Sequence, residues 1–168
     1  DLLIKGRIAK GNLVTKYAIK KIELKEKGIS TLRPRKIWYD DTVRRLNVEG
    51  RGDLLGEFKP EDRLLIITQS GRVKTVVPEL TTHFEEDMIV LEKWKPTKPI
   101  SAIYYDGEKA RYYVKRFVVE NENREDVFIS EHENSKLELI STDYRPVVEV
   151  VFSKVKGVQK ENLVLDLE

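Results

Sequence analysis

The sequence contains no cysteine, and it has only one methionine, two tryptophans and two histidines among its 168 residues. Without cysteine the chain can form neither a disulfide nor a thiolate metal site, which is compatible with a reducing compartment. The histidines, His83 and His132, have acidic neighbours, and their spacing matches no metal motif. We therefore expect two surface histidines and no metal site.

Long apolar runs are also missing, so no segment approaches the length of a membrane span, and the start shows no signal-peptide pattern. With 40% hydrophobic and 36% charged residues, the composition is typical of a soluble protein, and the cytoplasm is the expected location. No phosphate-binding loop, nucleophile elbow or paired-carboxylate arrangement is present. We expect no catalytic residue and no cofactor, which leaves an independent enzyme without support.

Helical periodicity is almost absent, since the only tempting segment, Lys20 to Lys27, is broken by Gly28. Short strands and turns are common instead. The clearest case is the stretch from Leu64 to Leu80, which reads as two strands around a turn at residues 69–71, with Pro78 ending the second. The sequence therefore predicts an all-β fold.

The near-neutral net charge of +2 conceals an asymmetry along the chain. Residues 1–60 carry 15 Lys+Arg against 8 Asp+Glu, and residues 61–168 carry 16 against 21, which gives +7 and −5. A basic half suggests a polyanionic partner. Two solvated surfaces without any partner explain the same numbers.

Strand-turn-strand segments recur along the chain. The repeats centre on Ile19, Val43, Val73, Val114 and Val147, at spacings of 24, 30, 41 and 33 residues, and correspond to hairpins at 13–22, 37–46, 64–77, 103–117 and 137–152. Such spacing is typical of stacked β-units, as in propeller blades or solenoid coils. A two-sheet sandwich is the alternative.

Two single strands, 53–58 and 88–94, complete the expected elements, and residues 153–168 are left as a tail. We treat residues 1–168 as one all-β domain. The chain opens on a strand without a lead-in, so we expect it to be a fragment of a longer protein.

The pattern from Ile66 to Lys74, apolar-apolar-Thr-x-x-Gly-x-Val-Lys, resembles the repeat of the C-terminal domain of the A subunits of bacterial type IIA topoisomerases. The segments Gly11–Lys21, Lys36–Asn47 and Gly52–Lys74 resemble in particular topoisomerase IV or gyrase-like A subunits of the Bacteroidetes type, and the likeness extends over residues 6–152.

This resemblance implies a β-pinwheel, a propeller-like ring of blades that exchange strands, whose basic rim binds and bends duplex DNA. About four blades or an open ring fit the chain length. The glycine-rich basic box of gyrases has no counterpart, because Gly50–Asp53 carries an acid. That difference favours a topoisomerase IV-like role.

Basic residues at recurring positions are the predicted contacts to duplex DNA, because lysine and arginine release counterions from phosphates without reading sequence. At the recurring positions they are Lys20, Lys21, Arg44, Arg45, Arg72, Lys74, Lys115 and Arg116; added contacts in the basic half are Lys10, Lys16, Arg33, Arg35 and Lys36. Solvated strand faces are the simpler interpretation of any single pair. Glu149 stands at the corresponding place of the last repeat, which makes that repeat a poor DNA contact.

In such an enzyme the partners are double-stranded DNA, the rest of the A subunit and the B subunit, and the location is nucleoid-associated. The enzyme's catalytic residues belong to other domains. A propeller-like module that contacts an acidic protein is the alternative function.

Overall fold

The computed structural model describes residues 6–23, 33–120 and 124–168, and its contacts divide the chain into two units, Asp1–Thr31 and Leu32–Glu168. All twelve strands of the described residues lie in the second unit, and these residues form no helix. The predicted all-β class is thus confirmed. No described helix could span a membrane.

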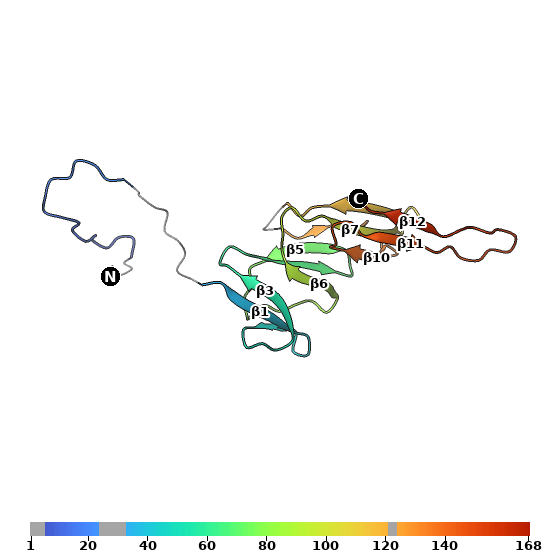
Figure 1. Cartoon of the computed structure of the whole chain (residues 1–168), viewed down its shortest axis with the longest axis horizontal. Helices are drawn as coiled ribbons and strands as arrows, with labels where there is room; N and C mark the ends of the chain where they lie inside the picture. Colours follow the sequence, from blue (N-terminus) through green and yellow to red (C-terminus); the bar gives the residue numbers. More distant parts are fainter. Residues whose placement is uncertain (1–5, 24–32, 121–123) are drawn as a thin grey trace. The chain divides into compact units, whose positions relative to one another are not determined.

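The strands form four antiparallel groups without a closed barrel among the described residues (Figure 1). Sheet A has the order β2-β1-β3, sheet B β6-β4-β5-β9, and sheet C β10-β7-β8, while β11 and β12 form a two-stranded ribbon. The bounds are β1 Arg35–Asp40, β2 Arg45–Asn47, β3 Asp53–Phe58, β4 Leu64–Thr68, β5 Arg72–Val76, β6 Met88–Lys93, β7 Ile100–Asp106, β8 Arg111–Phe117, β9 Asp126–Val127, β10 Lys136–Ser141, β11 Val147–Val150 and β12 Leu163–Asp166.

Sheet B is the middle layer, and its strand β4 is buried throughout. Side chains of a strand alternate between the two faces. Leu64 and Ile66 enter a core shared with Ile37 and Tyr39 of sheet A, whereas Leu65 and Ile67 enter a second core shared with Ile100 and Ala102 of sheet C. A two-sheet sandwich has one such core, so this alternative is wrong.

Each of these cores receives a phenylalanine from a loop. Phe84, between β5 and β6, is 1% exposed in the core between sheets A and B. Phe128, after β9, is 5% exposed in the core between sheets B and C. β9 follows β8 of sheet C but pairs with β5 of sheet B, so the segment of β9 and Phe128 connects sheet C to sheet B. Phe84 connects sheet B to sheet A through the other core.

The local hairpins of the second unit are confirmed. β4 pairs with β5, β1 with β2, and β7 with β8, as expected for 64–77, 37–46 and 103–117. The single strands predicted at 53–58 and 88–94 are β3 and β6, which join β1 and β4.

The hairpin expected at residues 13–22 is wrong, because residues 6–23 contain no strand. Their apolar side chains remain in solvent; Leu13, Val14 and Ile22 are 75%, 84% and 79% exposed. A two-stranded hairpin is marginal without a third strand or a core to cover it. The likeness to the 64–77 hairpin is therefore not enough to form strands here.

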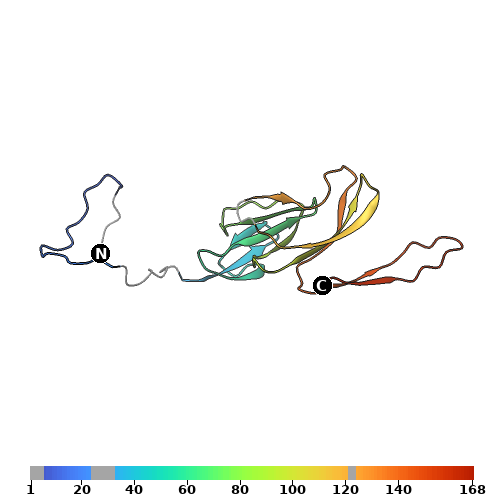
Figure 2. The ribbon, with the colours of Figure 1, turned by 90° about the horizontal axis from the view of Figure 1, so that it is seen from above.

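The hairpin expected at 137–152 is also wrong. β10 pairs with β7 rather than with β11, because Leu137 and Ile140 then reach the core beside Tyr104 and Ala102. β11 pairs instead with β12, inside the segment 153–168 that was expected to be a tail. Figure 2 shows this ribbon and its connecting loop lying outside the stacked sheets.

Candidate nucleic-acid interface

Four of the predicted DNA-binding residues, Lys10, Lys16, Lys20 and Lys21, belong to the first unit and are exposed there. Lys21 forms an ion pair with Glu23. The other nine belong to the second unit: seven of them fall into three groups, and Lys36 and Arg45 lie apart on sheet A.

The first group lines a shallow groove beside the ends of β3 and β5. Arg33, Arg35 and Lys59 lie along it with Phe58, Pro60, Val77 and Pro78, and no carboxylate lines it. The guanidinium of Arg35 donates a hydrogen bond of 3.3 Å to the carbonyl of Pro78, which anchors this side chain at the groove. The groove can accept an anionic group such as a phosphate, because its only charges are positive.

Lys36 and Arg45 lie on the face of sheet A that points away from the core. Their neighbours in the strands, Ile37 and Leu46, are buried, and alternation places the two bases on the opposite face. Lys36 stands opposite Glu57 and Arg45 opposite Asp40, but neither base forms an ion pair with a described residue. Both are exposed and available to a ligand.

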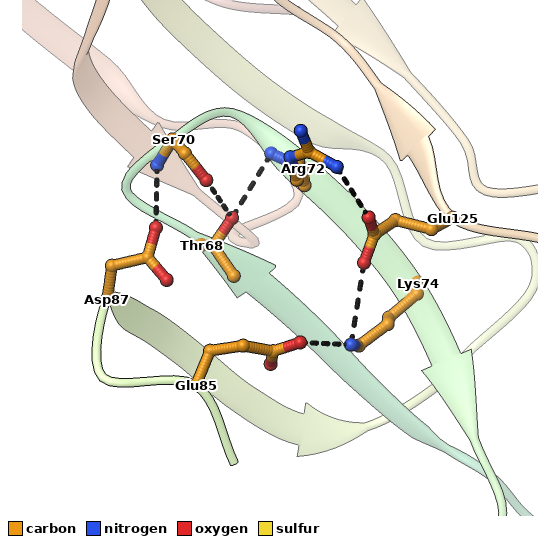
Figure 3. A network of polar contacts seen from close by, with 7 residues as sticks. All are labelled: Thr68, Ser70, Arg72, Lys74, Glu85, Asp87 and Glu125. Atoms are coloured by element: carbon orange, nitrogen blue, oxygen red, sulfur yellow. Dashed lines mark hydrogen bonds and ion pairs between the residues drawn. The ribbon is translucent and has the colours of Figure 1, made fainter.

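The second group, Arg72 and Lys74, lies on one face of β5 because the two residues are separated by one position. Both bind the same carboxylate (Figure 3): Arg72 Nη1 is 2.9 Å from Glu125 Oε1, and Lys74 Nζ is 3.4 Å from Glu125 Oε2. Lys74 also forms an ion pair with Glu85. These two bases are neutralised by acids of the chain itself.

Arg44 joins this network from the turn of sheet A, where its backbone is left-handed with φ of 52°. Its guanidinium donates a hydrogen bond to the backbone carbonyl of Glu85. Glu85 thus links sheet A to Lys74 of sheet B. Its neighbour Asp87 accepts a hydrogen bond of 3.2 Å from the backbone N–H of Ser70, which holds the same loop to the β4–β5 turn (Figure 3).

These contacts shift the titration of the network. The hydrogen bond from Arg72 lowers the pKa of Glu125; partial burial opposes this shift, and the positive charge of Lys74 supports it. Partial burial alone would lower the pKa of Lys74, but its bonds and charge interactions with Glu85 and Glu125 outweigh burial and raise it. Glu125 and Lys74 are therefore both charged near neutral pH.

The third group, Lys115 and Arg116, lies on β8, where consecutive residues point to opposite faces of sheet C. Lys115 turns toward the core side and donates a hydrogen bond of 2.5 Å to the carbonyl of Phe128. Arg116 donates one of 2.7 Å to the carbonyl of Tyr144, with its guanidinium 5.6 Å from the ring centre. The structure does not bring this pair to one face.

Three residues of the site were not identified from the sequence: Lys59 in the groove, and Glu85 and Glu125 in the network. Glu125 belongs to an acidic segment, residues 120–126, and Glu85 to an acid pair beside His83. The acids themselves are visible in the sequence. That they meet Arg72 and Lys74 depends on the tertiary structure, which brings Glu85 and Glu125 to the same face of β5.

Comparison with known families decides which class of protein contains these features. The model of the topoisomerase C-terminal domain of Bacteroidota matches residues 45–168, which is most of the chain. The chain belongs to this family. The resemblance to the C-terminal domain of a bacterial type IIA topoisomerase A subunit is thereby confirmed.

The match differs in extent from the resemblance read in the sequence, which covered residues 6–152. It includes β11 and β12 at the C-terminal end and leaves out residues 1–44. Arg33, Arg35 and Lys36 thus lie outside the matched part of this topoisomerase C-terminal domain, while Arg44 immediately precedes it. No curated protein and no solved structure matches the chain significantly.

Proposed function

We propose that this topoisomerase C-terminal domain binds and bends duplex DNA without reading its sequence, and presents DNA segments to the catalytic core of its ATP-dependent type IIA enzyme. The observation that supports this most directly is the groove of Arg33, Arg35 and Lys59, which no carboxylate lines. Sequence-independent binding needs cations at phosphate positions and no base contacts.

Bases contributed by more than one sheet suit this function, because each sheet can add contacts to the same duplex. Lys36 and Arg45 on sheet A, and Arg72 and Lys74 on sheet B, come from successive layers. Bending a duplex site by tens of degrees costs on the order of 1 to 6 kcal/mol, so contacts from several layers are needed to offset it. We infer that the layers are blades of a pinwheel, with β9 as an exchanged strand.

The remaining predicted contacts, Lys10, Lys16, Lys20 and Lys21 in the first unit and Arg44, Lys115 and Arg116 in the second, stay predictions. The proposed protein partners are the rest of the A subunit and the B subunit. A topoisomerase IV-like enzyme is favoured, because the sequence carries no gyrase-type glycine-rich basic box.

The test is fluorescence anisotropy of a labelled duplex of about 30 base pairs over a salt series, with the full chain. Binding should fall steeply with salt. The triple variant Arg33→Gln, Arg35→Gln, Lys59→Gln should bind more weakly, and its slope of log affinity against log salt should be flatter by up to about 2.7 if all three bases contact phosphates.

The matched control removes three charges elsewhere, by Lys154→Gln, Lys156→Gln and Lys160→Gln in the loop of the ribbon. This triple variant loses the same three positive charges as the groove variant but keeps the groove intact. It should therefore bind duplex DNA like the parent protein. Equal weakening by both triples would contradict the groove assignment. An absence of duplex binding at low salt would reject DNA binding and favour a protein-interaction module.

A further inference from the structure

The carboxylate of Glu125 is held by two different cations, one at each oxygen. Arg72 Nη1 binds Oε1 at 2.9 Å, and Lys74 Nζ lies 3.4 Å from Oε2 (Figure 3). Two non-bridging oxygens of a phosphodiester present the same kind of paired acceptor with one negative charge, and arginine and lysine are the residues that bind such groups.

We infer that Arg72 and Lys74 form a seat for one phosphate of duplex DNA, and that Glu125 competes with that phosphate for the same two cations. This inference rests on the proposed function, and it adds a specific seat and an internal competitor to it. Neither residue is sufficient alone, because each cation holds one oxygen of the shared acceptor.

The exposure of the side chains supports the replacement of the Glu125 carboxylate by a DNA phosphate. The side chain of Arg72 is 52% exposed and that of Glu125 35% exposed, so the pair lies at the surface. Ion pairs of this kind contribute little net stability, because water screens them and ordering two long side chains opposes them. A phosphate of a DNA strand, presented with many others, can therefore replace the carboxylate.

The backbone can stay in place during this exchange. Glu125 directly precedes β9, whose residues Asp126 and Val127 pair with Val73 and Arg72. Rotation of the Glu125 side chain alone vacates the two cations, and the strand pairing is retained. On its other side Lys74 remains bound to Glu85, which keeps the ammonium group on this face of β5.

The competitor should make binding at this seat weaker than its two bases alone would allow. Removing the Glu125 charge should tighten duplex binding about two- to fivefold, the range that corresponds to one exposed ion pair. It should also steepen the slope of log affinity against log salt by roughly 0.9, because about one more phosphate is neutralised.

The experiment compares Glu125→Gln with Glu161→Gln in the full chain, using the same labelled duplex and salt series. Both variants raise the net charge by one. Glu161 lies in the loop of the ribbon and forms no ion pair with a described residue. Glu125→Gln should tighten binding, and Glu161→Gln should not. Adding Glu125→Gln to the double variant Arg72→Gln, Lys74→Gln should change nothing, because the seat is then absent.

The outcomes separate this inference from the proposed function. If the parent protein binds duplex DNA but the Arg72→Gln, Lys74→Gln variant binds equally well, the seat is wrong and DNA binding stands. If that variant weakens binding but Glu125→Gln changes affinity no more than Glu161→Gln, the competitor is wrong. If no form binds duplex DNA, the proposed function itself fails. Glu125→Gln should melt at the same temperature as the parent protein, and this control would show that its fold is intact.

Discussion

The substitution Phe84→Ala tests the stacking of sheets A and B, on which the meeting of Arg44, Glu85 and Lys74 depends. Phe84 is 1% exposed, and its ring meets that of Tyr39 edge to face, with centres 5.5 Å apart and planes at 78°. Removing a buried phenylalanine costs about 3 to 5 kcal/mol, of which about 0.5 to 1.5 kcal/mol belongs to such a ring pair. The whole free energy of unfolding of a domain is about 5 to 15 kcal/mol, so this loss is large.

Urea unfolding followed by circular dichroism at 25 °C measures this loss. Phe84→Leu should lose less free energy of unfolding than Phe84→Ala, because leucine retains most of the apolar volume of the phenylalanine side chain. Phe152→Ala is the matched control: Phe152 lies outside both cores, with Lys160 Nζ 4.8 Å from its ring centre, and its loss should be about 1 kcal/mol.

Tryptophan fluorescence adds a layer-specific signal. Trp38 lies in β1 of sheet A, whereas Trp94 packs against the core between sheets B and C. Because Phe84 holds sheet A against sheet B, its removal should loosen sheet A, and with it the surroundings of Trp38, before those of Trp94, as measured with single-tryptophan forms. If Phe84→Ala lost no more free energy of unfolding than Phe152→Ala, this would refute the interpretation that Phe84 holds sheets A and B together.

Two further predictions concern the turns. At Gly52, with φ of +82°, a Cβ atom would lie 2.0 Å from the carbonyl oxygen of Tyr39, whereas at Gly50, with φ of +87°, it would meet nothing within 4 Å. Urea unfolding should therefore show a greater loss for Gly52→Ala than for Gly50→Ala, whose cost is the backbone strain of about 1 kcal/mol; equal losses would contradict the close approach. At Asp106, hydrogen bonds to its carboxylate, first from the backbone N–H of Lys109, lower the pKa below the ordinary value of 3.8. A lowered pKa in the folded state stabilises the protein above the unfolded pKa, and this contribution is lost as pH falls through the folded value. Asp106→Asn should therefore be less stable than the parent at pH 7, with a difference that shrinks below about pH 4; a constant difference in urea midpoints across the pH series would contradict this.

The local hairpins were predictable because each is specified by adjacent residues. In the 64–77 hairpin, Gly71 adopts φ of +80°, which the turn needs and which glycine adopts without strain. β4 is apolar throughout and β5 alternates, so their pairing needs no distant partner. The 37–46 and 103–117 hairpins are local as well, although their turns place Arg44 and Ala110, not a glycine, at positive φ.

Non-local pairings were not predictable in the same way. β9 has only two residues and gives no strand signal, yet it joins β5, from which it is separated by 49 residues between Val76 and Asp126. β10 and β11 look like neighbours in a hairpin, but the core favours β7 as the partner of β10. Burial of Leu137 decided this pairing, and burial is a property of the assembled sheets.

The features of the candidate site likewise separate into local ones, which the sequence predicts, and non-local ones, which it does not. The sequence alone determined that the chain is all-β, that its bases are concentrated in the first 60 residues, and that its repeat is that of a topoisomerase C-terminal domain. The first two features depend on composition, turns and alternation, and the third is a family resemblance carried by the motif Ile66–Lys74; all of them are local. Only the tertiary structure decided that Arg72 and Lys74 face Glu125 while Arg33 and Arg35 share an acid-free groove, because Glu125 is 53 residues from Arg72 and reaches it only through the pairing of β9 with β5.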